Sequence, residues 1–499
     1  MGNSGSSDQM GLTQRLSRFS PTEQARLWEV YDALVKMKPK TRIQDGFGLH
    51  ELQEYTNATL SQPMVNRLFR GFTVAIDDPK ETGGREVKVV RNAESTGISK
   101  KQFVAFLDAV LWGNMEDRGR VVCSMANSDG DGAICHQDQM QQFMVELIET
   151  GMSTLRRRLL LCGWQEEYMA VGGVGRLATS LTDGLASRIR LGKQLLHDSD
   201  KATTNDKQDF GREQIGEWLF RSPLVIDILI LVVTSALQLT SLDPTVRAVT
   251  VDKECACCVK LPYCEGIDWN DLDNRNDDSG MARRRTFLLD LPSVLFLNSQ
   301  LPSELRNRWR LLFSSALHGQ SFSGLCSKIV DEGPSLLLLR DTDGYVFGGF
   351  ASCSWELKPQ FQGNNLCFLF SLDPVLSIYT CTGYNDHYMY FTHGQQTIPN
   401  GLGMGGQHGY FGLWLDSDFG KGHSRAKPSC TTYGSPQLSA HEDFNLECLE
   451  VWALGEPAVN KKSLDGRSVL DADPESQAIL EMVGKSRHST GLREPHEEE

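Results

Sequence analysis

Clusters of basic residues are scarce in this chain of 499 residues. The longest runs, at residues 156–158 and 283–285, contain three arginines each, and the net charge is −14. Proteins that bind nucleic acid contact its phosphates with clustered lysine and arginine side chains. We therefore expect no nucleic-acid partner.

Long hydrophobic runs are also scarce. The longest, residues 224–239, spans 16 residues and contains Asp227, whereas a helix needs about 20 apolar residues to cross a bilayer core. We predict a helix buried in a protein core here, with a membrane-inserted segment as the alternative. Residues 1–20 lack the apolar segment of a secretion signal, so the 13 cysteines are expected to stay reduced in the cytosol.

The close group of cysteines in the middle of the chain lacks a zinc-binding spacing. Cys255, Cys257, Cys258 and Cys264 follow the pattern C-x-C-C-x5-C. Common zinc sites have two separated C-x-x-C pairs instead. Ordinary thiols are expected, with zinc binding and redox sensitivity as alternatives.

The first residues of the chain match an N-myristoylation signal. Gly2 follows Met1, and Ser6 supplies the hydroxyl residue that the signal requires. The alternative is a flexible leader, because small polar residues are common at chain ends. We predict that residues 1–19 form a myristoylated leader. Since one myristoyl chain binds membranes only marginally, a protein partner is expected to supply a second contact.

Residues 20–152 have the pattern of a helical domain. Ser20, Pro21 and Glu23 supply a cap, a first-turn proline and an early acid, as helix starts do. Further helices are expected at residues 49–59, 100–112 and 138–149.

A loop between the last two of these helices resembles an EF-hand calcium loop. Its ligand positions and its sixth-position glycine are filled by Asn127, Asp129, Asp131, Gly132, the carbonyl of Ala133, and Asp138. Ile134 stands where paired EF-hands join through a short β-bridge. Asn127 replaces an acid and Asp138 replaces a longer glutamate, so calcium binding is expected to be weak. A plain acidic surface loop is the alternative.

Two earlier stretches, residues 45–49 and 96–99, look like eroded copies of the same unit because each keeps a glycine but lacks the set of acidic ligands. We therefore interpret the domain as EF-hand-like and as mainly a scaffold. Residues 153–285 are interpreted as a helical middle region with an acidic linker at residues 268–280. Helices are expected there at residues 154–196 and 210–238.

Residues 456–499 form a polar tail that contains one short amphipathic helix. Asp473 and Pro474 predict its start. Its apolar face consists of Ile479, Leu480, Met482 and Val483. A helix of about ten residues is not stable alone in water, so this face needs a surface on its own domain or on a partner.

Residues 286–455 change to short strand-like segments with frequent turn signals, which favours a β-sandwich. Asp343 and Gly344 predict a hairpin turn between two strands. Two helical pieces, one capped by Pro302 and one after Gly319, interrupt the strands. Strands are expected at residues 336–340, 345–351, 366–370, 387–392, 409–415 and 444–452.

The same segment resembles the TLDc-domain family. The motifs that carry the resemblance are Trp309-Arg310-Leu311-Leu312-Phe313-Ser314, His318-Gly319-Gln320-Ser321-Phe322, Gly401-Leu402-Gly403-Met404-Gly405-Gly406, Gly412-Leu413-Trp414-Leu415-Asp416 and Leu449-Glu450-Val451-Trp452. His423 and Tyr433 depart from the family pattern. The resemblance implies a two-sheet β-sandwich with flanking helices. The whole chain is therefore expected to be an α+β multidomain protein with an all-α EF-hand-like N-terminal domain.

With its leader and helical domain included, the chain resembles a lysosomal, mTOR-associated branch of this family. The resemblance implies a non-enzymatic regulator that binds catalytic-sector subunits of the vacuolar-type proton pump (V-ATPase) and supports mTOR signalling with its components. It also implies a location on the cytoplasmic face of the lysosomal membrane, with a cytosolic pool. The alternative is an oxidation-resistance protein with a redox or hydrolytic activity.

The residues themselves give the catalytic alternative little support. The sequence contains no G-x-S-x-G or H-E-x-x-H pattern. The thiols of this domain have apolar, strand-like neighbours and are interpreted as core residues: Cys326, Cys353, Cys367 and Cys381. No catalytic residue and no required cofactor are expected, calcium in the acidic loop being the one candidate. For contact with a partner we predict Asp416 and Asp418 in the polar loop of residues 415–424, with a merely solvated loop as the alternative.

Overall fold

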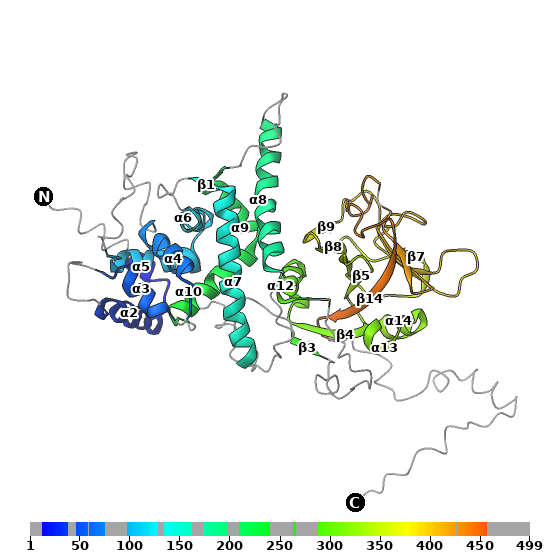
Figure 1. Ribbon diagram of the computed structural model, residues 1–499, viewed down its shortest axis with the longest axis horizontal. Coiled ribbons are helices and arrows are strands. Elements are labelled where there is room, and N and C mark those ends of the chain that lie inside the picture. Colours follow the sequence, from blue (N-terminus) through cyan, green and yellow to red (C-terminus); the bar gives the residue numbers. More distant parts are fainter. Residues whose placement is uncertain are drawn as a thin grey trace, which may run out of the picture.

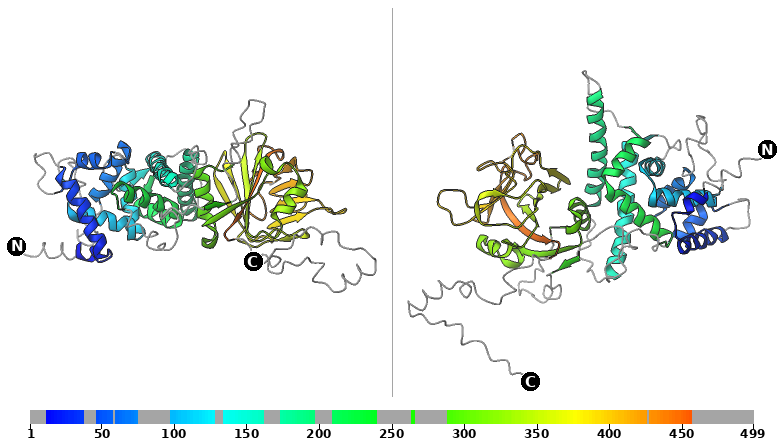
Figure 2. Two further views of the ribbon diagram at one scale, coloured as in Figure 1. Left: turned by 90° about the horizontal axis from the view of Figure 1, so that it is seen from below. Right: turned by 180° about the vertical axis from the view of Figure 1, so that it is seen from behind.

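The computed structural model has a helical N-terminal part and a β-rich C-terminal part that lie side by side (Figure 1). The views from below and from behind show the same division (Figure 2). The predicted helical N-terminal region and β-sheet C-terminal region are therefore confirmed. The structure describes residues 12–37, 46–57, 59–74, 97–127, 134–161, 173–196, 209–239, 263–265, 288–425 and 427–456.

The N-terminal part is built from helices of 8 to 25 residues. They are α2 (Pro21–Lys36), α3 (Leu49–Thr56), α4 (Gln62–Val74), α5 (Lys100–Trp112), α6 (Met115–Ala126), α7 (Gln137–Leu161), α8 (Val174–Leu196), α9 (Arg212–Arg221) and α10 (Pro223–Ala236). α5 has the predicted bounds. α3 ends three residues before the predicted position, and α7 continues well beyond it.

α2 begins where the sequence predicts. The Ser20 hydroxyl accepts a hydrogen bond from the Glu23 N–H at 3.4 Å, and the Glu23 carboxylate accepts one from the Ser20 N–H at 2.7 Å. This reciprocal cap satisfies two N–H groups that have no partner within the helix. The cap signals of this sequence are thus sufficient to place the start of the helix.

α10 is the apolar segment for which a membrane location was the alternative. The prediction of a core helix is confirmed, because 11 of its 14 residues are buried. Its Ile228 lies so close to α7 that a Cβ added to Gly151 would come within 2.5 Å of the Ile228 Cγ2. In the described ranges no single helix is long and apolar enough to cross a bilayer. α9 and α10 meet that test only as a pair bent by 97°.

The prediction of one continuous helix at residues 210–238 is wrong. A short strand, β2 (Asp209–Gly211), comes first, and α9 and α10 follow as separate helices. Proline disfavours helical backbone at the residue before it. Ser222, which precedes Pro223, accordingly has φ −121° and ψ 64°, outside the helical region. The proline therefore ends one helix and starts the next in a new direction.

The C-terminal part is a 12-stranded sheet in the order β7-β10-β11-β12-β13-β14-β5-β6-β8-β9, with β4 and β3 joined to it through β14. All its strand pairs are antiparallel except β3 with β4. Its strands are β3 (Tyr263–Glu265), β4 (Arg308–Ser314), β5 (Ser335–Asp341), β6 (Val346–Ala351), β7 (Lys358–Gln362), β8 (Phe368–Asp373), β9 (Ser377–Thr380), β10 (Met389–Thr392), β11 (Gly401–Met404), β12 (Leu413–Asp416), β13 (Lys421–His423) and β14 (Asp443–Leu454).

β14 joins two wings of this sheet, one made of β7 and β10–β13 and the other of β5, β6, β8 and β9. It pairs with β13 near its start, with β4 near its end, and with β5 along most of its length. The wings face each other across a buried apolar cluster that includes Leu337 and Leu369 from one and Leu402 and Leu413 from the other. The approach is close, because a Cβ added to Gly349 would lie 2.4 Å from the Met404 sulfur.

The predicted strands of this part all occur, with shifted bounds, and several further strands were not predicted. Among these, β11 lies in the glycine-rich motif, which is a buried strand followed by a turn. The predicted helical pieces are a short 3-10 helix at Ser303–Leu305 and α14 (Phe322–Ile329), which follows the one-turn helix α13 (Ser315–His318).

A helix that the sequence did not reveal, α12 (Leu291–Gln300), joins the two parts (Figure 1). Leu291–Asn298 is buried along its whole length. One continuous apolar cluster runs from the N-terminal helices through α12 to Phe350, Phe370 and Trp452 of the sheet. A short, mostly apolar run can belong to a strand or to a buried helix, which is why its pattern alone did not identify it.

Polar contacts fix the start of α12. The Asp290 carboxylate caps the helix by accepting the Ser293 N–H at 2.9 Å. Arg176 of α8 donates to the same carboxylate at 3.1 Å and also pairs with Asp373 at the end of β8. One arginine of the helical part thus contacts both the helix cap and the sheet.

Glu450 of β14 supports this junction from inside the sheet. Its carboxylate accepts hydrogen bonds from the Leu288 N–H at 3.2 Å and from the Trp452 indole N–H at 3.1 Å. Burial raises the pKa of Glu450 to about 7, although both hydrogen bonds and the nearby Arg340 favour the charged form. Removal from water is therefore the dominant effect on this carboxyl.

The raised pKa of Glu450 predicts a pH-dependent stability. The unfolded carboxyl loses its proton near pH 4.5, whereas the folded one holds it up to about pH 7. Between these values the folded state binds more protons, so this group lowers the free energy of unfolding as pH rises. We expect the melting temperature of the wild-type protein to fall relative to that of Glu450→Gln between about pH 5 and pH 8.

Thermal melts of the two proteins across this range measure the effect. Glutamine keeps one acceptor for the two N–H donors but does not titrate. Parallel pH profiles for the wild-type protein and the variant would contradict the prediction.

Candidate functional site

The helical part repeats one structural unit four times. In each unit, two helices flank a segment that ends in a short β-bridge: α2–α3, α4–α5, α6–α7 and α8–α9. Phe47 of the first unit pairs with Ile98 of the second. Cys135 of the third, in β1 (Ile134–His136), pairs with Phe210 of the fourth. All four bridge residues are buried.

The helix after each bridge starts in the same way. The residue after the bridge residue is the helix cap, and the third residue of the helix turns its side chain back to the N–H of that cap. The pairs are Gly48 with Glu51 at 2.8 Å, Ser99 with Gln102 at 2.9 Å, His136 with Gln139 at 3.1 Å, and Gly211 with Gln214 at 2.9 Å.

The repeat identifies which residue of the acidic loop corresponds to the bridge residue of the other units. Ile134 takes part in the predicted strand pairing, opposite Gly211. It is 47% exposed, however, and the buried bridge residue is Cys135. Gln139, one residue after Asp138, is therefore the counterpart of Glu51 in the first unit.

The structure describes only part of the predicted ligand set. Asn127 and Asp138 lie within the described residues, whereas Asp129, Asp131 and Ala133 lie outside them. Asn127 directly follows α6, and its side-chain amide donates to the Ile134 carbonyl at 2.7 Å across the loop. Its own carbonyl accepts from Arg70 of α4 at 2.6 Å. Among the described residues, no three His, Cys, Asp or Glu side chains converge as a metal site would need.

A buried ion pair positions the start of this loop. The Arg67 guanidinium of α4 contacts the Glu146 carboxylate of α7 at 2.6 Å. It also donates to the last carbonyls of α6, at Met125 and Ala126. A cation is favoured at this helix end because the carbonyl groups there lack partners. The two helices that flank the loop are therefore held by one side chain of a third.

The two aspartates predicted to contact a partner lie on the β12–β13 hairpin. The Asp416 Oδ1 accepts the Asp418 N–H at 3.1 Å and so closes the turn. Phe419 follows with φ 61° and packs into the core, edge-on to Phe313. Asp418 is exposed. This turn is therefore pinned to the sheet and presents its acidic side chains from a fixed position.

A stack of rings covers the sheet beside this hairpin. Trp414 stacks on Phe411 with ring centroids 4.7 Å apart, and on His423 at 5.9 Å. A Cβ added to Gly403 would lie 2.8 Å from the Phe411 ring and 2.9 Å from the Trp414 ring. The glycine of the family motif is thus needed because large rings lie flat against the strand.

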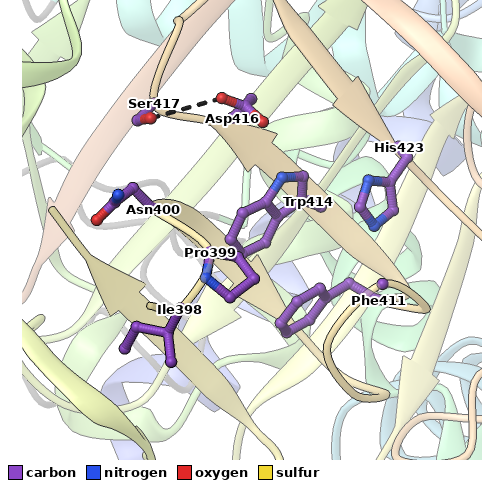
Figure 3. A pocket seen from close by; sticks show the side chains of 9 residues that line it. Ile398, Pro399, Asn400, Phe411, Trp414, Asp416, Ser417 and His423 are labelled. Atoms are coloured by element: carbon purple, nitrogen blue, oxygen red, sulfur yellow. Dashed lines mark hydrogen bonds between the residues drawn. The ribbon is translucent and has the colours of Figure 1, made fainter. Parts of the chain in front are cut away.

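A hollow of about 350 Å³ opens above these rings (Figure 3). Trp414 lies at its centre, with Asn400, Asp416 and His423 around it. Burial, together with the nearby Arg425, lowers the pKa of His423 to about 4, so the imidazole is neutral at neutral pH. The prediction named Asp416 but missed Asn400, Trp414 and His423. Glycines alternating with large residues in Gly401–Met404 were the one signal of rings against the strand.

The thiols of this part are arranged for packing. Burial raises the pKa of Cys326 to about 11, and it also raises those of Cys353 and Cys448. A thiol needs to ionise to act as a nucleophile, so these groups are poorly suited to that role at neutral pH. Cys326 and Cys367 are buried, whereas Cys353 and Cys381 are half-buried.

The remaining predicted sites lie outside the described residues. They are the lipidation site Gly2, the cysteines Cys255, Cys257 and Cys258, and the tail residues Ile479, Leu480, Met482 and Val483.

Comparison with known proteins gives matches to both a domain and whole chains. The model of the TLDc domain matches residues 284–455. MTOR-associated protein MEAK7 of Gallus gallus is 42% identical over 505 residues, which cover 99% of this chain and 99% of that protein. MTOR-associated protein MEAK7 of Homo sapiens is 43% identical over 495 residues, 97% of each chain.

A more distant relative matches in part. Nuclear receptor coactivator 7 of Homo sapiens is 34% identical over 175 residues, which cover 35% of this chain and 18% of that protein. The end-to-end matches therefore carry the assignment. With a TLDc domain and identity above 40% along nearly the whole length, the chain belongs to the TLDc-domain family that MTOR-associated protein MEAK7 represents.

Proposed function

We propose that this protein is a non-enzymatic regulator that binds V-ATPase catalytic-sector subunits and supports mTOR signalling at the cytoplasmic face of the lysosomal membrane. The observation that carries the mTOR part is the end-to-end similarity to proteins named MTOR-associated protein MEAK7. The pump and the lysosome are what the resemblance of the sequence to this branch of the family implies.

Binding is favoured over catalysis by the chemistry of the C-terminal part. The raised pKa values of Cys326, Cys353 and Cys448 leave these thiols protonated at neutral pH. The His318 Nδ1 accepts the Ser314 N–H at 3.0 Å, which engages that imidazole with the backbone. A redox or hydrolytic activity, the alternative, would need an ionised nucleophile with a base beside it.

Membrane attachment is proposed to use two contacts. Myristate on Gly2 supplies a weak and reversible one. The pump supplies the other, through the TLDc domain with Asp416 and Asp418 and through the tail helix with Ile479, Leu480, Met482 and Val483. A pool of the protein in the cytosol follows from the reversibility of each contact.

We further propose that the four repeated units are EF-hand-like and serve mainly as a scaffold. Paired units joined by a β-bridge are the arrangement expected of EF-hands, and all four units have this bridge. Weak calcium binding is proposed for the loop that contains Asn127, Asp129, Asp131, Ala133 and Asp138. The neutral Gln139 lies where the first unit has an acid, which supports a low affinity.

Affinity purification from lysosomal membranes tests the central proposal. We expect the tagged wild-type chain to recover V-ATPase catalytic-sector subunits. A chain that ends at Glu456 should recover less, because it lacks the tail helix. Gly2→Ala should leave the membrane fraction while still binding the detached catalytic sector, since the variant loses only the lipid contact.

Each part of that proposal has its own contradicting result. Recovery of unrelated soluble proteins alone would contradict pump binding. Unchanged membrane fractionation of Gly2→Ala would contradict myristoylation, even if the pump subunits were recovered.

Calorimetric titration with calcium tests the acidic loop. We expect a weak signal that disappears in the Asp129→Ala/Asp131→Ala double variant. Asp138→Glu should strengthen binding by about tenfold, because it places the longer carboxylate that EF-hand loops use at the last position of this ligand set. Identical titrations for the wild-type protein and both variants would show that the loop binds no calcium.

A further inference from the structure

The hollow above Trp414 presents polar atoms that have no hydrogen-bond partner. The His423 Nε2 is buried and makes no hydrogen bond within the described residues. The Asp416 Oδ1 accepts the Asp418 N–H, whereas the Oδ2 takes part in none of the hydrogen bonds of the described chain. A buried polar atom without a partner is unfavourable. The hollow therefore has the features of a site that a hydrogen-bond donor completes.

The charge of the hollow is negative. Asp416 forms no ion pair with any described residue, and Lys421 of the neighbouring strand makes none with it. Arg425 is the cation whose charge acts on His423, and it is already paired with the Asp443 carboxylate at 2.7 Å. Asp416 thus remains uncompensated at the rim of the site, beside an imidazole that stays neutral.

The side chains that line the hollow are held in fixed positions. Asp416 is held by its own turn, and Trp414 and Phe411 are almost completely buried. The Asn400 side chain is fixed on the opposite side by two hydrogen bonds with the backbone of Gln395. Its Oδ1 accepts the Gln395 N–H at 2.8 Å, and its Nδ2 donates to the Gln395 carbonyl at 2.7 Å. A preorganised site loses little conformational entropy when a ligand binds.

We propose that this hollow binds the guanidinium group of an arginine side chain presented by a partner polypeptide. The Asp416 carboxylate supplies the charge and, at Oδ2, an acceptor, and the polar side chains of Asn400 and His423 line the same hollow. An anion would be repelled by Asp416. The proposal goes beyond pump binding, because it concerns the chemistry of the recognised side chain and holds for any partner.

The probe for this site is N-acetyl-L-arginine amide, titrated into the full-length protein and followed by saturation-transfer NMR of the probe. N-acetyl-L-citrulline amide, which has nearly the same shape but no charge, is the matched control ligand. We expect saturable binding of the arginine probe with a Kd of about 1–10 mM, and at least about tenfold weaker binding of the citrulline probe.

Two variants locate the binding. Asp416→Asn keeps the Oδ1 that closes the turn. It removes the charge and replaces the Oδ2 acceptor with an NH2 donor, so the variant should fold and should bind the arginine probe at least about tenfold more weakly. Asp418→Asn removes the same charge two residues away, outside the hollow, and should change the affinity by less than about twofold. Circular dichroism melts check that both variants are folded.

Three results would overturn the proposal. They are the absence of saturable binding to the wild-type protein, equal binding of the citrulline probe, and equal losses in Asp416→Asn and Asp418→Asn. None of these depends on the pump, so the site and the proposed function succeed or fail separately.

Discussion

Burial of α12 between the helices and the sheet is the constraint on which the arrangement of this molecule depends. The helix has no polar face, so neither part can leave it exposed to water without a large cost. Its apolar neighbours come from α8 and α10 on one side and from the sheet on the other. Domains that share such a core move less freely than those joined by a polar interface.

Polar groups at the same junction fix the position of α12 relative to the sheet. Arg176 reaches both Asp290 and Asp373, and Glu450 holds the backbone of Leu288 just before the helix. Such contacts add little where they are exposed, but they fix the position of α12 along the sheet. The hairpin with Asp416 is fixed relative to the same sheet through β13 and β14. A partner that binds this hairpin therefore binds a surface whose position relative to the four helical units is set.

Local signals in the sequence predicted much of the fold. Ser20 and Pro21 placed the start of α2, and two short apolar runs on either side of Asp343-Gly344 placed β5 and β6. Two local signals were overlooked: Asp290 and Pro292, which mark the start of α12, and Pro223, which ends α9. Contacts between residues far apart in the chain could not be predicted. His423 and Asn400 became part of a site only when β11, β12 and β13 brought them to one hollow.

The central claim is that α12 unites the two parts into one core. Hydrogen–deuterium exchange of the full-length chain tests it directly, because amide protection reports the free energy of local opening. The account predicts that peptides from α12 are protected as strongly as those from β5, and that both lose protection together as denaturant rises. Fast exchange of α12 while β5 and α10 stay protected would contradict it.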